Sequence, residues 1–528
     1  MTGPTLMTGR TLSIVLALAF SQPIFAQTDS APDRVTSGRP PPGMLLASFE
    51  AEDAMIAGRR HMMAFRMNAA EGAFETLLRE PGNDEAATYH LAAIAFIKAM
   101  LAQSEPEYSA FFERSDALLE LLGDRDDFDE RQDGKQVAWL LFMDAENYLM
   151  RAFVQARKGD FLRTAVSAHE AYNVYLDALR ADPTLIDVET GVGLLKAMIG
   201  ATPQAYKKFL RLLGYSGTIE EGLRLLDHAA KKARYNGGQA ALFRNLTRVY
   251  MNKGRNMATE ELKVRFEEDR NPATGLMYTF ALRYSRRPDE AVVVAREAIR
   301  LGETVEFIQA PFLFFHLGSA LFSLNQFEEA ATELDTYIKM FKGQSYRATA
   351  QVRLGLSLEM LGRRPEAVAV YKHTEAPTEF DFDVAAEHAA EDLLANPMNE
   401  DRKALLRGRN AVSGGRSEEA LAVLEPVFFR PEVSAVDRTE AAYWLGRAHQ
   451  IAGGFEEAAT KYFYVRTHPA GEGLRWAPWA TYYLGRIREK ENKPAEARDL
   501  FEEVLDYKGD FDFKKSLRRN VRLAIDGL

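Results

Sequence analysis

Apolar residues recur at three- and four-residue spacing along almost the whole chain from about Leu46 onward. The segments 86–102 and 110–122 are examples, and no sustained stretch alternates between apolar and polar residues as a half-buried strand would. Such spacing places the apolar side chains on one face of an α-helix. The pattern therefore predicts an all-α protein.

A recurring pair of small residues divides the C-terminal half into units. Five times, a glycine in an apolar helical stretch is followed twelve residues later by the alanine of a Glu-Ala dipeptide. The pairs are Gly318/Ala330, Gly355/Ala367, Gly408/Ala420, Gly446/Ala458 and Gly485/Ala497. Turn-forming clusters such as "LGRRP" and "SGGRS" lie between the two members, so each unit is predicted to be two antiparallel helices with a tight connection.

Close helix packing explains why these positions are small. Antiparallel helices approach closely only where side chains are short, so we expect each glycine and alanine to mark a helix crossing. A glycine inside a helix costs about 1 kcal/mol relative to alanine, and close packing has to offset that cost. The fourth residue after each alanine is large and is expected to fill the core between repeats; these residues are Leu334, Tyr371, Leu424, Tyr462 and Phe501.

This pattern resembles the tetratricopeptide repeat, which has Leu-Gly in its first helix and Ala followed by an aromatic residue in its second. The resemblance covers about residues 311–508, and a weaker sixth unit has Glu290-Ala291 with Thr279 at the glycine position. Successive glycines lie 37, 53, 38 and 39 residues apart, against a usual period of about 34. Residues 375–397 are therefore predicted to be an insertion with its own short helix. The resemblance implies a right-handed superhelical solenoid of antiparallel helix pairs, about six of them over residues 271–528.

The N-terminal half, residues 46–270, follows the same helical pattern with degenerate repeats. Within it, residues 191–252 are similar to the middle region of bacterial envelope tetratricopeptide proteins. They are also similar to the group that includes tetratricopeptide repeat protein thirty-nine and the inclusion-body clearance protein. The matching features are Gly191, Gly193, Pro203, the turn at residues 214–217, and Gly222-Leu223. This second resemblance implies degenerate repeats without a catalytic constellation.

The first residues predict export. Residues 1–26 contain one basic residue followed by an apolar run from Leu12 to Phe20, which is typical of a signal peptide cleaved after Ala26. That run is too short to cross a bilayer core of about 30 Å, and no later stretch approaches the required length. Residues 27–45 are rich in Pro, Ser and Gly and are expected to be a flexible leader. We expect a protein secreted across the inner membrane into the periplasm of a Gram-negative envelope.

Composition and motifs argue against several activities. The chain has no cysteine, and its nine histidines include no pair at the helical spacing of a metal site. Phosphate-binding and nucleophile motifs are missing, and a net charge of −10 does not favour nucleic-acid binding. We therefore expect no catalytic residue, cofactor or metal ligand.

One set of residues is a candidate binding face. The resemblance implies that the first helix of each pair lines a concave groove, and the residue after the glycine in three successive units is Arg409, Arg447 and Arg486. The same face is expected to present Tyr443, Trp444, Trp479, Tyr482 and Tyr483. Arginine, tyrosine and tryptophan are enriched at binding hot spots. Alternatively, the arginines pair with glutamates of neighbouring helices and the aromatic residues form core.

These observations predict a non-catalytic scaffold or adaptor that holds a segment of another envelope protein, and an acidic segment would complement the arginines. Two alternatives remain open. One is an envelope enzyme whose site lies unrecognised within residues 46–270. The other is a purely structural solenoid that associates with itself.

Overall fold

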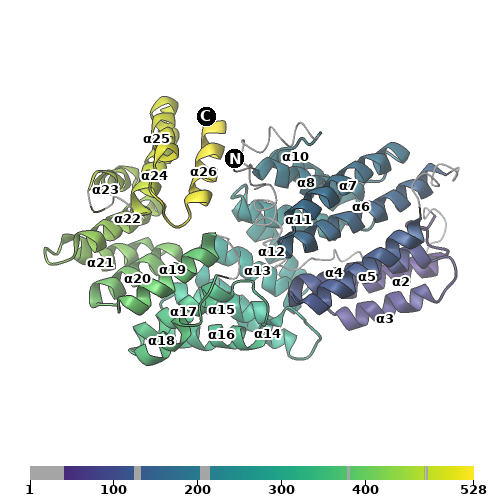
Figure 1. Ribbon diagram of the computed structural model, residues 1–528, viewed down its shortest axis with the longest axis horizontal. Helices are drawn as coiled ribbons and strands as arrows, with labels where there is room; N and C mark the ends of the chain where they lie inside the picture. Colours follow the sequence, from purple (N-terminus) through teal and green to yellow (C-terminus); the bar gives the residue numbers. More distant parts are fainter. Residues whose placement is uncertain (1–40, 124–132, 203–213, 377–380, 469, 471–473) are drawn as a thin grey trace, which may run out of the picture. The chain divides into compact units, whose positions relative to one another are not determined.

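The computed structural model describes residues 41–123, 133–202, 214–376, 381–468, 470 and 474–528. The predicted signal peptide and most of the predicted leader lie outside these residues. Every regular element in the described ranges is an α-helix (Figure 1), which confirms the all-α prediction.

Contacts between residues divide the chain into two compact units. The N-terminal unit consists of Met1–Ser285, Arg296–Leu313 and Phe341–Gly343. The C-terminal unit consists of Arg286–Ala295, Phe314–Met340 and Gln344–Leu528. Helices α14 (Pro288–Gly302) and α15 (Ala310–Ser323) contribute to both.

The N-terminal unit is built from consecutive helices that pack as antiparallel neighbours, as α6 and α7 do in Figure 1. Its helices are α2 (Phe49–Met63), α3 (Met67–Leu78), α4 (Asp84–Ala102), α5 (Glu105–Leu122), α6 (Gly134–Arg157), α7 (Phe161–Ala181), α8 (Val188–Ala201), α10 (Ile219–Lys232), α11 (Gly237–Tyr250), α12 (Arg255–Glu268) and α13 (Pro272–Tyr284).

Two glycines of the degenerate region allow α8 and α10 to touch backbone to backbone. A Cβ atom added to Gly222 would lie 2.5 Å from the carbonyl oxygen of Gly193, too close for any side chain. The side chain of Thr218 accepts a hydrogen bond from the backbone N–H of Glu221, and the Glu221 carboxylate accepts one from the backbone N–H of Thr218, so a capping box begins α10. Close packing thus explains two glycines of the segment 191–252.

The C-terminal unit contains the five predicted helix pairs, α15/α16, α17/α18, α20/α21, α22/α23 and α24/α25. Helix α19 lies within residues 375–397, where we predicted an insertion, and α26 follows the last pair. The bounds are α16 (Phe327–Met340), α17 (Arg347–Met360), α18 (Arg364–Tyr371), α19 (Asp381–Ala395), α20 (Glu400–Ser413), α21 (Ser417–Phe429), α22 (Ala435–Ala452), α23 (Phe455–Thr467), α24 (Trp476–Lys490), α25 (Pro494–Asp506) and α26 (Lys514–Asp526).

The turn between α20 and α21 packs against a turn far back in the sequence. Arg416 donates a hydrogen bond through Nη2 to the carbonyl oxygen of Ser323, 2.8 Å away. Asn410 donates through Nδ2 to the carbonyl oxygen of Phe322, also at 2.8 Å. The two turns meet although about 90 residues of chain, including α17, α18 and α19, lie between them.

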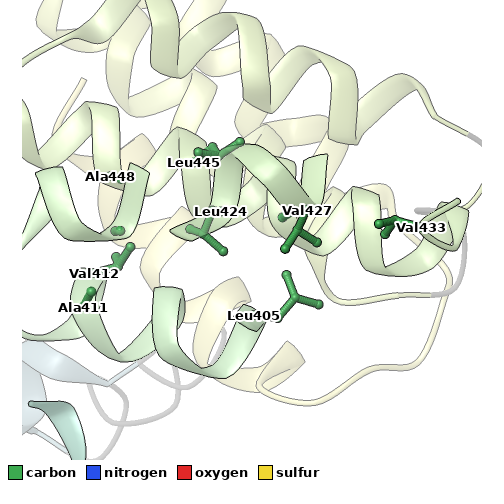
Figure 2. Close-up of a cluster of buried hydrophobic side chains, with 10 residues drawn as sticks. Leu405, Ala411, Val412, Leu424, Val427, Val433, Leu445 and Ala448 are labelled. Carbon is green, nitrogen blue, oxygen red and sulfur yellow. The ribbon is translucent and has the colours of Figure 1, made fainter. Parts of the chain in front are cut away.

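Apolar side chains of α20, α21 and α22 form a continuous core (Figure 2). Leu424 from α21 and Leu445 from α22 are completely buried, and Leu405 from α20 is 3% exposed. The labelled residues in Figure 2 come from all three helices, so each helix buries one stripe against its two neighbours.

The repeat glycines have a different partner from the one that we predicted. A Cβ atom added to Gly446 would lie 2.6 Å from Cε1 of Tyr462, four residues beyond Ala458. The large residue at the same position of the other four repeats likewise comes nearest to its glycine: Leu334 to Gly318, Tyr371 to Gly355, Leu424 to Gly408 and Phe501 to Gly485. Each glycine therefore makes room for the large core residue of the second helix.

The repeat alanines lie in the core of the helix pairs. All five are completely buried, namely Ala330, Ala367, Ala420, Ala458 and Ala497. The atom nearest to the Cβ position of each glycine belongs to the large residue and not to the alanine. The large residue, one turn further along the same face, reaches back over that position. The alanines fit the space that remains beside it.

Candidate protein-binding surface

Helices α22 and α24 carry most of the residues predicted for the binding face. The Ser434 side chain accepts a hydrogen bond from the backbone N–H of Asp437 and begins α22. Gly453, with φ of 90°, ends this helix in the left-handed conformation that favours glycine. In α24, Pro478 lies in the first turn, where its missing N–H removes no helical hydrogen bond. These ends fix the register of the aromatic residues.

Tyr443 lies beneath the surface for which we predicted it. Its side chain is 5% exposed, and its ring centroid lies 4.9 Å from that of Trp476 and 5.0 Å from that of Trp444. Aromatic rings in such tilted and edge-on arrangements attract one another. The structure therefore places Tyr443 in the core of the repeats, where it supports Trp444 from below.

Trp479, Tyr482 and Tyr483 are partly exposed and lie against one another on α24. Trp479 stacks on Tyr483 with a centroid separation of 5.9 Å, and Tyr483 stacks in turn on Tyr462 at 5.7 Å. Tyr482 packs against Phe501 of the next helix at 5.8 Å. These three predicted residues therefore form one aromatic surface whose underside is held by the repeat core.

Arg447 extends from α22 over this aromatic surface. Its Cζ lies 3.9 Å from the centroid of Tyr483, and its Nη1 donates to Oε1 of Gln450 at 2.7 Å. The same Gln450 oxygen accepts a hydrogen bond from the Tyr462 hydroxyl at 2.8 Å. Arg447 forms no ion pair with a carboxylate of the described ranges. Its positive charge is held in place by neutral groups alone.

Arg409 of α20 is partly buried, and its side chain forms no hydrogen bond or ion pair with the described residues. Burial is the main cause that lowers the pKa of its guanidinium. The carboxylate of Glu440 acts in the opposite direction, and the guanidinium of Arg475 adds to the decrease. Arg409 nevertheless remains charged, because arginine does not lose its proton in proteins.

Glu440, Arg475 and Trp476, which lie beside predicted residues of this region, were not predicted. Glu440 accepts a hydrogen bond from Nε1 of Trp444 at 3.1 Å, which ties this carboxylate to the aromatic surface. Arg475 lies over the ring of Trp476, with Cζ 4.3 Å from its centroid, and its Nη1 is 3.7 Å from Oδ2 of Asp512. In the sequence, Trp476 stands three residues before Trp479, which was the available signal for it.

Arg486 occupies a different environment from the other two arginines. Its side chain is 43% exposed, and its Nη1 lies 3.0 Å from Oε2 of Glu489 on the same helix. Exposed pairs of this kind contribute little energy. The three predicted arginines are thus not equivalent, because Arg486 has a carboxylate partner while Arg409 and Arg447 have none in the described residues.

We name Arg409, Trp444, Arg447, Trp479, Tyr482, Tyr483 and Arg486 the aromatic–arginine surface. It combines flat apolar rings with two guanidinium groups, those of Arg409 and Arg447, that form no ion pair with a carboxylate of the described ranges. Such a surface can accept an anionic group by charge-assisted hydrogen bonds and an apolar group by ring contact.

Two stretches of the chain match the model of a known repeat family. The family model described as "Tetratricopeptide repeat" matches residues 315–379 and 405–472. These ranges include most of α20, all of α22 and three residues of the aromatic–arginine surface, Arg409, Trp444 and Arg447. No curated protein matches the chain.

Solved structures of low similarity also match the chain. The crystal structure of the APC/C hetero-tetramer Cut9–Hcn1 matches at 14% identity and a TM-score of 0.28, over 90% of this chain and 97% of that one. The crystal structure of yeast Tom70 matches at 11% identity and a TM-score of 0.25, over 90% and 96%. At these TM-scores the likeness adds nothing to what the helix pairs and the family model establish.

The described residues include neither a candidate membrane span nor a candidate metal site. Among the described helices, none has both the length and the apolarity that crossing a bilayer requires. Within the same ranges, no three His, Asp or Glu side chains are grouped so that they could hold a metal ion.

Proposed function

We propose that this protein is a non-catalytic scaffold of the cell envelope that captures a segment of another protein on the aromatic–arginine surface. Tetratricopeptide repeats support a role in protein interaction, since repeat solenoids offer long continuous binding surfaces. The observation that carries the proposal is the pair of guanidinium groups, Arg409 and Arg447, that lack carboxylate partners within the described residues.

The chemistry of the surface favours an acidic partner segment with an aromatic or aliphatic side chain nearby. A carboxylate on the partner would give Arg409 the charge-assisted hydrogen bonds that it lacks. An apolar neighbour would cover Trp479 and Tyr483, whose rings are already immobilised by stacking. Pre-ordered side chains lose little entropy on binding, which improves affinity.

The location in the envelope rests on the sequence. The predicted signal peptide over residues 1–26 and the similarity of residues 191–252 to envelope tetratricopeptide proteins support it. Expression of the full chain and fractionation of the cells test it. Recovery of a shortened protein in the periplasmic fraction is expected, whereas a full-length cytoplasmic protein would refute the location.

Crosslinking in the cell tests the binding surface. A photoreactive phenylalanine derivative replaces Trp444, and in a matched control it replaces Glu502, an exposed residue of α25. We expect a specific crosslinked partner from position 444 and not from 502, and we expect Arg409→Gln to remove it. A crosslink of equal strength in the Arg409→Gln protein would refute the assignment of the surface.

Self-association is a distinct outcome of the same experiment. The captured protein could be a second copy of this chain. In that case the protein is a self-associating solenoid, the second alternative that the sequence left open, and not an adaptor. Light scattering over a range of concentrations would then show a mass that rises with concentration.

A further inference from the structure

The segment between α25 and α26 has the chemistry that we propose for the partner. Residues 509–513 read Gly-Asp-Phe-Asp-Phe, so two carboxylates alternate with two aromatic rings. The side chain of Asp510 is 99% exposed, whereas Asp512 and Phe513 are partly buried. The last two residues of the segment therefore contact the rest of the C-terminal unit.

These two residues flank Arg475 at the start of α24. Oδ2 of Asp512 lies 3.7 Å from Nη1 of Arg475, and the centroid of the Phe513 ring lies 6.0 Å from its Cζ. Arg475 lies over the ring of Trp476, whose centroid is 5.7 Å from that of Trp444. Because Trp444 belongs to the aromatic–arginine surface, the segment reaches the edge of that surface with one carboxylate and one ring.

Helix α26 keeps the segment in this place. Leu517 and Val521 of α26 are completely buried in a core that this helix shares with α25, beside which it lies in Figure 1. Trp479 and Tyr482 of the aromatic–arginine surface pack against the same core. A segment that is anchored beside a binding surface competes for it at a high effective concentration.

The same residues are also attached to α19, the helix that precedes the three repeats with the surface. Nδ1 of His388 donates a hydrogen bond to Oδ1 of Asp512 at 2.8 Å. The backbone N–H of Ser516 donates to Oδ2 of Asp381 at 2.9 Å. These partners lie 124 and 135 residues apart along the chain. The contact therefore joins the two ends of the stretch in which α20, α22 and α24 carry the surface.

The contact with α19 is weak, and the turn into α26 is strained. The His388 side chain is 55% exposed, and charged pairs at exposed positions contribute little energy. Phe513 has a φ of 65°, in the left-handed region that residues other than glycine rarely adopt. A released segment would lose this strain, so both features lower the cost of its displacement.

We propose that residues 509–513 are an internal ligand of the aromatic–arginine surface, which an acidic partner segment must displace. The carboxylate of Asp512 occupies the place beside Arg475 that a partner carboxylate would take. This inference rests on the proposed function, because it assigns one surface both to the partner and to the chain's own segment. It adds a means by which the protein limits capture.

A peptide supplied separately tests the proposal on the mature full-length protein. The probe is a fluorescein-labelled peptide with the sequence of residues 507–514, and fluorescence anisotropy measures its binding. The double variant Asp512→Asn/Phe513→Ala loses the internal ligand, so we expect it to bind the peptide at least about tenfold more tightly than the unmodified protein does. Asp510→Asn, at the exposed end of the segment, is the control and should bind as the unmodified protein does. Equal binding by the double variant and the unmodified protein would overturn the proposal.

A second peptide and a further variant locate the site. A peptide with asparagine at both aspartate positions keeps the rings but loses the carboxylates, and we expect the double variant to bind it at least about tenfold more weakly. Arg475→Gln, added to the double variant, removes the guanidinium and should weaken binding of the original peptide equally. Far-UV circular dichroism confirms that each variant is folded. Tight binding that survives either change would contradict the roles of Asp512 and Arg475.

Hydrogen exchange tests the contact without the peptide or the double variant. In Arg475→Gln alone, the segment loses its contact with α24, so the amides of residues 509–513 should exchange faster than in the unmodified protein. The amides of α21 should exchange at the same rate in both proteins. Unchanged exchange of residues 509–513 would show that Arg475 does not hold the segment.

The internal ligand and the scaffold function fail in different ways. The photoreactive residue at position 444 is placed in the unmodified protein and in the double variant, and we expect the double variant to capture more partner. Equal capture by both would overturn the internal ligand and leave the scaffold function in place. Tight peptide binding without any captured partner would support the internal ligand and count against the scaffold.

Discussion

The guanidinium of Arg447 lies against the ring of Tyr483, with Cζ 3.9 Å from the ring centroid, and so connects α22 to α24. This contact holds a charged group at a surface without using a carboxylate, since a ring face attracts a cation but does not neutralise it. The charge remains available to a partner while its position is fixed.

A double-mutant cycle measures this contact. Arg447→Lys keeps the charge but loses the planar overlap, and Tyr483→Leu removes the ring. We expect a coupling free energy of about 0.5 to 2 kcal/mol from urea denaturation of the single and double variants. The cycle of Arg486→Lys with Tyr483→Leu is the control, because Arg486 pairs with Glu489; equal coupling in both cycles would show that the Arg447 contact is not specific.

Arg409 is expected to contribute to partner binding and little to stability. Arg409→Gln removes a charge that has no ion pair in the described ranges, so we expect an unchanged melting temperature and partner binding weaker by about tenfold or more. Arg402→Gln is the matched control on α20, because Arg402 already pairs with Asp392. Surface plasmon resonance with the crosslinked partner measures binding by both variants, and thermal unfolding measures their melting temperatures. A loss of stability without a loss of binding would assign Arg409 a role in the fold instead.

Gly446→Ala is expected to destabilise the C-terminal unit, although alanine normally favours a helix by about 1 kcal/mol. The added Cβ would lie 2.6 Å from Cε1 of the fully buried Tyr462, so the two helices must move apart. Gly72→Ala in α3 is the control, since a Cβ there has no neighbour within 4 Å. Thermal unfolding should show a lower melting temperature for Gly446→Ala and an equal or higher one for Gly72→Ala. A higher melting temperature for Gly446→Ala than for Gly72→Ala would mean that the Tyr462 side chain moves aside without a loss of stability.

Glu146 is expected to make the N-terminal unit less stable as pH rises. Its pKa is about 7 in the folded protein and 4.5 as the ordinary value, so between these values the folded state holds the proton more tightly and stability falls, by at most about 3 kcal/mol. His90 acts in the opposite direction, because burial lowers its pKa to about 3 and its contribution grows with pH.

A comparison of the Glu146→Gln variant with the unmodified protein separates the effect of Glu146 on stability from that of His90. Urea denaturation of Glu146→Gln and of the unmodified protein is compared from about pH 4.5 to pH 7.5. We expect the variant to gain relative stability over this range, and Glu113→Gln, at an exposed position of α5, to show no such trend. A constant difference across the range would mean that Glu146 ionises normally.

The sequence predicted the helix pairs and the burial of the five repeat alanines because both follow from a local rule with a fixed spacing. It did not predict that each glycine packs against the large residue sixteen positions later, since spacing alone does not say which of two nearby side chains is closer. It also placed Arg447, Trp479 and Tyr483 on one face, and the structure brings these three side chains together, while binding by this face stays a prediction. It placed Tyr443 on the surface, whereas its side chain is buried in the core of the repeats. The neighbouring residues on a helix do not indicate how deeply a side chain is buried.

Neither the environment of Arg475 nor the contact between Arg59 and Asn236 in the N-terminal unit was predicted, for a common physical reason. Both depend on groups that come together from distant parts of the chain, as Arg59 and Asn236 do across 177 residues. The residue periodicity within one helix does not indicate which distant segment of the chain that helix contacts.

The contact between Arg59 and the segment at Tyr235 and Asn236 affects how the N-terminal unit folds while the chain is made or exported, N-terminus first. The α2 helix leaves the machinery that makes or exports the chain while its partner at Tyr235 and Asn236 is still 176 to 177 residues behind. Closing so long a loop is slow, and the side of α2 that later contacts Tyr235 and Asn236 stays uncovered in the interval. Holding chaperones should therefore associate with chains truncated before residue 236 and release those that extend past it.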